Sequence, residues 1–107
     1  MLKQRHSKYY EAILQIRPAT DDVMQFILGY LESRKDCQIS NTAGLKTGID
    51  LYLTSQRVAL ALGKKMKEHF KGSTLKISRS IHHRDRFTSK DVYRVTVLFR
   101  LPKQAQE

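Results

Sequence analysis

The stretch SRSIHHRDRFTSK, residues 78–90, places two histidines and three arginines in one short run. Side chains of these types serve three kinds of site: a metal centre, a general acid–base pair and a surface that grips phosphate. His82 and His83 are adjacent, so in an extended segment they point to opposite faces, and neither a cysteine nor a well-spaced carboxylate accompanies them. The run therefore does not indicate a metal site, and we expect no bound metal.

Catalysis by these histidines would require a partner that holds one tautomer and a pocket that holds a substrate. Asp85 is available as the partner, but a loop or hairpin tip in a 107-residue domain rarely forms a deep pocket. An RNase-like or other hydrolytic role is thus the weakest functional interpretation. We expect no enzymatic activity, no cofactor and no small-molecule substrate.

The third interpretation is that these side chains bind phosphate and lie on a protruding β-hairpin. Arginine offers a planar fork that grips phosphate bidentately, and histidine and Phe87 offer rings for unpaired bases. The predicted RNA-binding residues of this run are Arg79, His82, His83, Arg84, Arg86 and Lys90. A solvated turn whose charges contact nothing is the alternative, and composition alone does not separate the two.

The net charge of the chain indicates which kinds of binding partner it attracts. The chain has 20 Lys and Arg against 10 Asp and Glu, a net charge of +10. Residues 1–53 carry 7 basic and 6 acidic side chains, whereas residues 54–107 carry 13 and 4. A field of this sign concentrates polyanions, so nucleic acid and acidic membrane are the partners to weigh.

Targeting signals and cysteine content set further limits. The first ten residues lack the apolar core of a signal peptide, and no window approaches the roughly 18 apolar residues of a membrane span. Cys37 is the single cysteine, which excludes an internal disulfide and a zinc site built on paired thiolates. We expect a cytoplasmic protein with no membrane partner, and assign no chemistry to Cys37.

Apolar periodicity in the first half predicts a strand, a helix and a strand pair. Alternation predicts the strand over about residues 8–17, and Pro18 ends it. Its buried face would carry Tyr10, Ala12, Leu14 and Ile16. Thr20 or Asp21 can cap a helix that runs to about Arg34. Two strands or a ragged hairpin around residues 41–48 follow, with an inward set of Ile49, Leu51 and Leu53.

The second half predicts a basic amphipathic helix followed by two strands. Ser55 can cap the helix, whose apolar stripe is Val58, Leu62, Met66 and Phe70. The basic side chains that fall off this stripe are Lys64, Lys65, Lys67 and Lys71. A small domain needs the stripe for its core, so we discount a membrane-surface role. The first three of these lysines join the predicted RNA-binding residues, and the basic helix favours RNA over a solvated turn.

Gly72 ends this helix, and alternation returns in STLKISRSI and KDVYRVTVLFRL, which should pair antiparallel. By this alternation the inward positions of the two segments are Leu75, Ile77, Tyr93, Val95, Val97, Phe99 and Leu101. The element order predicts an α+β fold: a two-layer sandwich with two helices on one face of a mostly antiparallel sheet. We expect a single domain over residues 1–107 with a core of about 8–102, and expect residues 1–7 and 103–107 to be flexible.

Four stretches spread over nearly the whole chain resemble one family: YYEAILQIR, GIDLYLTS, LKISRSIHHRDRFTSK and YRVTVLFRLP. They resemble the nonsense-mediated decay protein three family, whose eukaryotic members act as the nuclear export adaptor of the large ribosomal subunit. The chain is similar to the middle α/β domain of the family's shorter, archaeal type. The resemblance implies a ribosome-biogenesis factor whose partner is ribosomal RNA or the large subunit.

The chain departs from that family at several points. The family's amino-terminal part carries Cys-x-x-Cys zinc motifs, but Cys37 is alone here. The OB-like domain that usually follows the Leu101-Pro102 region is absent, as is a leucine-rich export signal. We therefore expect an excised domain or a short paralogue, and carry over neither zinc binding nor nuclear shuttling.

Two functional hypotheses follow. The first is a non-enzymatic RNA-binding module that acts in large-subunit assembly or export. The second is a protein-interaction scaffold whose basic face binds an acidic protein.

Overall fold

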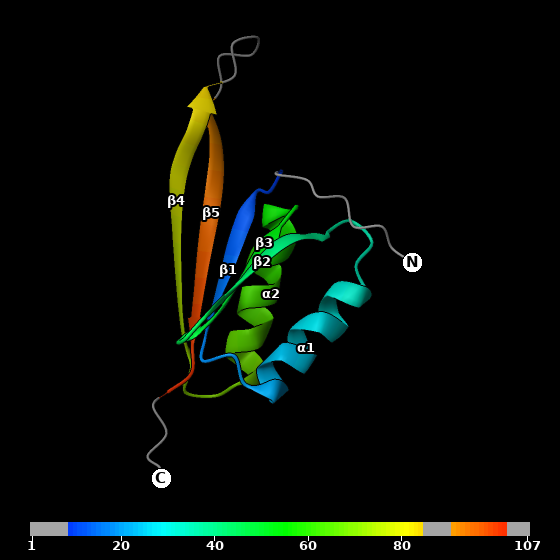
Figure 1. The fold of residues 1–107 in the computed structure, drawn as a ribbon, viewed down its shortest axis with the longest axis vertical. Helices are drawn as coiled ribbons and strands as arrows, with labels where there is room; N and C mark the ends of the chain where they lie inside the picture. Colours follow the sequence, from blue (N-terminus) through cyan, green and yellow to red (C-terminus); the bar gives the residue numbers. More distant parts are fainter. Residues whose placement is uncertain (1–8, 85–90, 103–107) are drawn as a thin grey trace.

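A computed structural model describes residues 9–84 and 91–102, which form one five-stranded sheet and two helices (Figure 1). The elements in chain order are β1 (Ala12–Arg17), α1 (Asp21–Glu32), β2 (Ile39–Leu45), β3 (Gly48–Leu53), α2 (Gln56–His69), β4 (Thr74–Arg84) and β5 (Asp91–Arg100). The terminal residues for which we predicted flexibility lie outside the described residues. Neither helix has the length and apolar character that a membrane crossing needs.

The strands lie in the order β2-β3-β1-β5-β4. β1 is central, antiparallel to β3 and parallel to β5, and the remaining pairs are antiparallel. Both helices lie on the same side of the sheet (Figure 1). This arrangement confirms the predicted α+β sandwich with two helices on one face of a mostly antiparallel sheet.

Strand alternation determines which face of the sheet meets the helices. Ala12, Leu14 and Ile16 of β1 are fully buried. Their partners on β5 are Val95, Val97 and Phe99, and their partners on β3 are Leu53, Leu51 and Ile49. The helices cover this face with Val23, Ile27, Leu31, Val58, Leu62 and Met66, all buried. The intervening strand residues lie on the opposite side, which we call the open face.

Both helices begin where the sequence predicts. Thr20 Oγ1 accepts a hydrogen bond from the Val23 N–H at 3.4 Å, and Ser55 Oγ accepts one from the Val58 N–H at 3.2 Å. These side chains satisfy backbone donors that the first helical turn leaves without a partner. The helix ends come earlier than predicted: α1 ends at Glu32, and Phe70 is the cap residue of α2 rather than its last turn.

The predicted orientation of Tyr10 is wrong. β1 begins at Ala12, and the chain bends at Glu11, whose Oε1 accepts a hydrogen bond from the Gln56 N–H at 2.9 Å at the start of α2. A carboxylate is favourable at a helix amino terminus, so Glu11 turns toward the helices. Tyr10 instead packs edge-on against Tyr52, with ring centroids 4.9 Å apart, on the open face. The strict alternation of inward and outward side chains therefore holds from Ala12 onward but not at Tyr10 and Glu11.

Two predicted inward positions are also exposed. Ile77 and Tyr93 lie on the helix-facing side of β4 and β5, but 41% and 42% of their surfaces are accessible. Tyr93 lies beyond the Ala12–Val95 pair, where β4 and β5 continue past β1 and the part of the sheet that the helices cover. Ile77 is opposite the buried Val97, but it belongs to β4, the edge strand of the sheet.

Candidate nucleic-acid interface

The β4–β5 ribbon extends beyond the rest of the sheet, as Figure 1 shows. β1 pairs with β5 from Ala12 opposite Val95 onward. Beyond that point, from Ser80 opposite Arg94 to Arg84 opposite Asp91, β4 and β5 pair with each other and with no other described strand. An 11-residue strand is about 36 Å long at about 3.3 Å per residue, so the ribbon carries its end well away from the core.

Most of the predicted phosphate-binding run belongs to a strand rather than to a loop. Arg79 is exposed on β4, and the backbone of His82, His83 and Arg84 continues this strand. A register shift between Ile81 and His83 marks a bulge, which increases the local twist of a ribbon. The side chains of His82, His83 and Arg84, and the whole of Arg86 and Lys90, lie outside the described residues. Their contacts remain a prediction.

The α2 lysines that we predicted to bind RNA are exposed to solvent, and the helix that carries them packs closely against the sheet. Lys64, Lys65 and Lys67 are all exposed. Between them and the sheet lies Gly63, where an added Cβ would come within 3.0 Å of Val97 and 3.2 Å of Leu75. Such close packing fixes the position of α2 against β4 and β5. The lysines of α2 therefore have a fixed position relative to β4 and β5, the two strands that form the ribbon.

The described ion pairs leave these cations without acidic partners. The salt bridges among described residues join Arg17 to Asp50 at 2.8 Å, and both Arg34 and Arg57 to Asp36 at 3.3 and 3.6 Å. No carboxylate in residues 9–81 or 93–102 pairs with the cations of the second half of α2 or of β4, which are Lys64, Lys65, Lys67, Lys76 and Arg79. Lys67 Nζ donates only to the Ser73 carbonyl, at 3.5 Å. The three α2 lysines and Arg79 lie on the helix side of the sheet and Lys76 lies on the open face, and both sets are available to an external anion.

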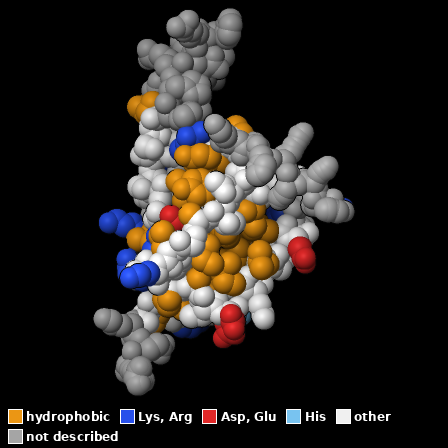
Figure 2. Space-filling model, viewed as in Figure 1, with side chains coloured by type: hydrophobic (Ala, Val, Ile, Leu, Met, Phe, Trp, Pro, Cys, Tyr) orange, Lys and Arg blue, Asp and Glu red, His pale blue; other side chains and the backbone are white. Residues whose placement is uncertain are grey.

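Glu68 is the acidic residue of α2; it is exposed and forms no salt bridge with a described residue, and further acidic groups on the helix side belong to α1 or follow it. Asp21 and Asp22 begin α1, and Figure 2 shows acidic side chains at the α1 side of the molecule. The hydrogen bond from Arg34 lowers the pKa of the Asp36 carboxyl, and the charge of Arg57 adds to this effect. Asp36 is therefore ionised at neutral pH and neutralised by its own arginine partners, so it does not offset the α2 lysines.

Cysteine and metal chemistry find no support among the described side chains. Cys37 is 5% exposed within the core, and burial raises the pKa of its thiol. A buried thiol with a raised pKa is a poor nucleophile. Within the described part of the chain, no group of three His, Cys, Asp or Glu side chains is arranged to hold a metal ion. His82 and His83 are not among these side chains, so their role stays a prediction.

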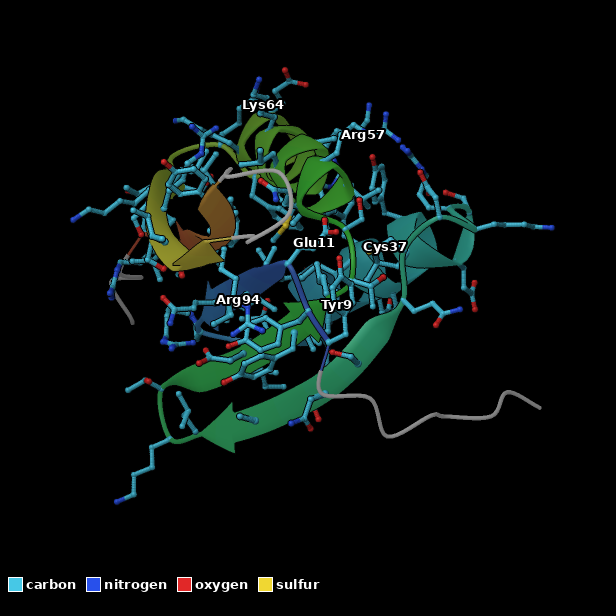
Figure 3. The ribbon with its side chains drawn as sticks, turned by 90° about the horizontal axis from the view of Figure 1, so that it is seen from above. Tyr9, Glu11, Cys37, Arg57, Lys64 and Arg94 are labelled. Carbon is cyan, nitrogen blue, oxygen red and sulfur yellow. The ribbon has the colours of Figure 1, made fainter. Side chains whose placement is uncertain are left out.

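Sequence reasoning missed a cluster on the open face. The guanidinium carbon of Arg94 lies 3.8 Å from the centroid of the Tyr10 ring, which in turn contacts Tyr52. Alternation could have placed Tyr52 and Arg94 together, because each lies next to buried residues of β3 and β5. It could not have placed Tyr10, whose orientation depends on the distant Gln56 N–H. Figure 3 shows Arg94 on one side of the sheet and Lys64 and Arg57 on the other.

A comparison with models of known protein families assigns this chain to a family. The family model described as NMD3, second domain, matches residues 9–101, which is most of the chain and nearly all of the described fold. NMD3 abbreviates the nonsense-mediated decay protein three that the four sequence stretches resemble. A search of curated proteins found no match to the chain.

Proposed function

The chain belongs to the NMD3 family, a family of ribosome-export adaptors, and on this premise we propose that it binds the large ribosomal subunit through ribosomal RNA. Its role is then in the assembly or export of that subunit, as a binding module with no catalytic step. The family acts in export between nucleus and cytoplasm, and we place this chain at the cytoplasmic end of that route.

One observation supports the proposal: Lys64, Lys65 and Lys67 of α2 and Arg79 of β4, all on the helix side of the sheet, have no acidic partner among the described side chains. Lysine side chains that are close together on a helix repel one another, and this repulsion destabilises the helix slightly. Phosphate groups relieve this repulsion, and neutralising them releases counterions from the RNA. The face therefore suits a polyanion.

We place the contact on two neighbouring elements. The helix supplies Lys64, Lys65 and Lys67, and the ribbon supplies Arg79, His82, His83, Arg84, Arg86 and Lys90. A projecting two-stranded ribbon can reach phosphates that lie beyond the helix-covered part of the sheet, while the helix lysines bind the RNA backbone beside it. Such a contact is largely electrostatic and poorly selective for sequence, because phosphate contacts position a protein without reading bases.

Salt dependence tests this proposal. Raising salt from about 50 to about 200 mM should lower the affinity for purified large subunits by two to three decades if about four to six phosphates are neutralised. Binding is measured by sedimentation or fluorescence anisotropy at each salt concentration. An affinity that does not change with salt would contradict the proposal. Stronger binding to an acidic protein than to large subunits at matched salt would favour the scaffold hypothesis.

A further inference from the structure

The open face of the sheet has its own aromatic and basic character. Tyr52 of β3 and Arg94 and Leu98 of β5 lie on this face, because they alternate with the buried residues of their strands. Lys76 of β4 and Arg100 of β5 extend the basic part of the face and are exposed. No described helix or loop covers it, since α1 and α2 lie on the other side (Figure 1).

Three side chains form a defined cluster at one end of this face. The Tyr10 and Tyr52 rings meet edge to face at an interplanar angle of 86°, and the Arg94 guanidinium lies over the Tyr10 ring. Arg94 Nε also donates a hydrogen bond to the Tyr10 carbonyl at 3.2 Å. All three side chains are only partly buried. The cluster is therefore preorganised, and parts of it remain in contact with solvent.

The charges on this face suit an anion. Asp50 is the acidic side chain that the described strands place on the open face, and it is bonded to Arg17 at 2.8 Å. No carboxylate of the described residues forms a salt bridge with Arg94, Lys76 or Arg100. A partner that combines negative charge with flat rings would match both properties of the surface.

From this arrangement we propose that the open face binds unpaired nucleotides of RNA. One or two bases stack on the exposed parts of Tyr52, Tyr10 and the Arg94 plane, and Lys76 and Arg100 neutralise the adjoining phosphates. Domains that pack helices on one face of a sheet use aromatic side chains of the open face in this way, and arginine planes also stack on bases. The inference rests on the proposed function in that the RNA would be ribosomal. It adds a second surface, opposite the α2 lysines, for single-stranded rather than duplex RNA.

Tyr52→Leu tests the proposal directly, because leucine keeps an apolar side chain at this strand position and removes the ring. The probe is a single-stranded RNA of about 12 nucleotides, within the range of site sizes of single-strand binders. The same sequence as a blunt duplex is the second probe. Affinity for the single strand should fall about tenfold, since a stacked base contributes between about fivefold and about a hundredfold, whereas affinity for the duplex should change less than about threefold.

Tyr93→Leu is the matched control. Tyr93 is equally a strand tyrosine, 42% exposed, but it lies on the helix-facing side of β5. Its replacement should leave binding of the single strand within about threefold of wild type, because the proposed stacking site lies on the opposite face of the sheet. Equal losses in Tyr52→Leu and Tyr93→Leu, or no loss in either, would overturn the proposal.

Intrinsic fluorescence gives a second readout. The chain has 5 tyrosines and no tryptophan, so its emission comes from tyrosine alone. Single-stranded RNA should quench this emission in wild type and Tyr93→Leu, and quench it less in Tyr52→Leu. If Tyr52→Leu lowers the unfolding temperature, Arg94→Gln decides in its place: it should weaken single-strand binding about as much, and unchanged binding would overturn the proposal.

The remaining outcomes separate this inference from the proposed function. If wild type binds large subunits but Tyr52→Leu retains full single-strand affinity, the inference fails and the proposed function stands. If single-strand binding depends on Tyr52 but large subunits are not bound, the proposed function fails instead. A self-association of wild type that Tyr52→Leu abolishes would mean that a second copy occupies the open face, and would overturn the inference.

Discussion

Replacing both Arg84 and Arg86 by glutamate is expected to weaken binding to the large ribosomal subunit by well over tenfold. A tenfold loss corresponds to about 1.4 kcal/mol, which is less than two charge-assisted contacts to phosphate usually contribute. Arg84 ends β4 and Arg86 follows it in the sequence, whereas the buried residues of β5 lie toward the other end of the β4–β5 ribbon. Thermal unfolding should therefore stay close to that of wild type.

The helix part of the proposed contact is tested by Lys64→Glu combined with Lys65→Glu. Both side chains are exposed and have no hydrogen bond to the protein among the described contacts, whereas Lys67 donates to the Ser73 carbonyl and is left in place. Binding to large subunits should again fall at least tenfold. A second loss of this size would show that the helix and the ribbon bind together.

Lys35→Glu combined with Lys46→Glu is the matched control. Both lysines are exposed, and they lie outside α2, β4 and β5. Each of the three double variants lowers the net charge from +10 to +6, because every replacement of a cation by an anion removes two charges. If only the long-range field mattered, all three would weaken binding alike. Equal losses would contradict a defined contact surface on the ribbon and α2.

Gly48→Ala should destabilise the fold by about 3 kcal/mol, at the upper end of the usual cost of overpacking. The added Cβ would lie 1.8 Å from the Ile16 carbonyl oxygen and 3.1 Å from the Arg17 side chain. The obstacle is mainly backbone of the central strand β1, which cannot move without disturbing its pairing with β3 and β5. Urea or thermal unfolding, followed by circular dichroism, measures the loss.

Gly44→Ala serves as the comparison for this variant. Gly44 lies on the neighbouring strand β2, and no heavy atom lies within 4 Å of an added Cβ there. Alanine at this site should be neutral or stabilising by up to about 1 kcal/mol, because glycine loses more conformational freedom on folding. If Gly44→Ala destabilised the protein as much as Gly48→Ala, close approach to β1 would not be the cause.

The fold class was accessible from the sequence because its signals are local. Thr20 and Ser55 cap the helices that they were predicted to cap, and alternation identified the buried faces of β3 and β5. The strand order was not accessible in the same way. The parallel pairing of β1 with β5 joins Ala12 to Val95, and no local pattern specifies a partner at that distance along the chain.

The candidate site was only partly predictable for the same reason. The α2 lysines were placed correctly in solvent, since helical periodicity separates them from Leu62 and Met66. The His82–Arg84 segment was predicted at a hairpin tip, whereas its backbone belongs to β4, because pairing with β5 extends the strand. The open-face cluster was missed because a non-local hydrogen bond to Glu11 sets the direction of Tyr10.

Sedimentation with separated ribosomal subunits tests the central claim most directly. The full chain is mixed with purified large or small subunits at about 0.1 M salt, where exposed charges within about 10 Å still interact, and the pellets are compared. The proposed function predicts that wild type pellets with the large subunit well in excess of the small subunit, and that the excess is reduced in the Arg84→Glu, Arg86→Glu variant. Equal pelleting with both subunits, or pelleting with neither, would contradict it.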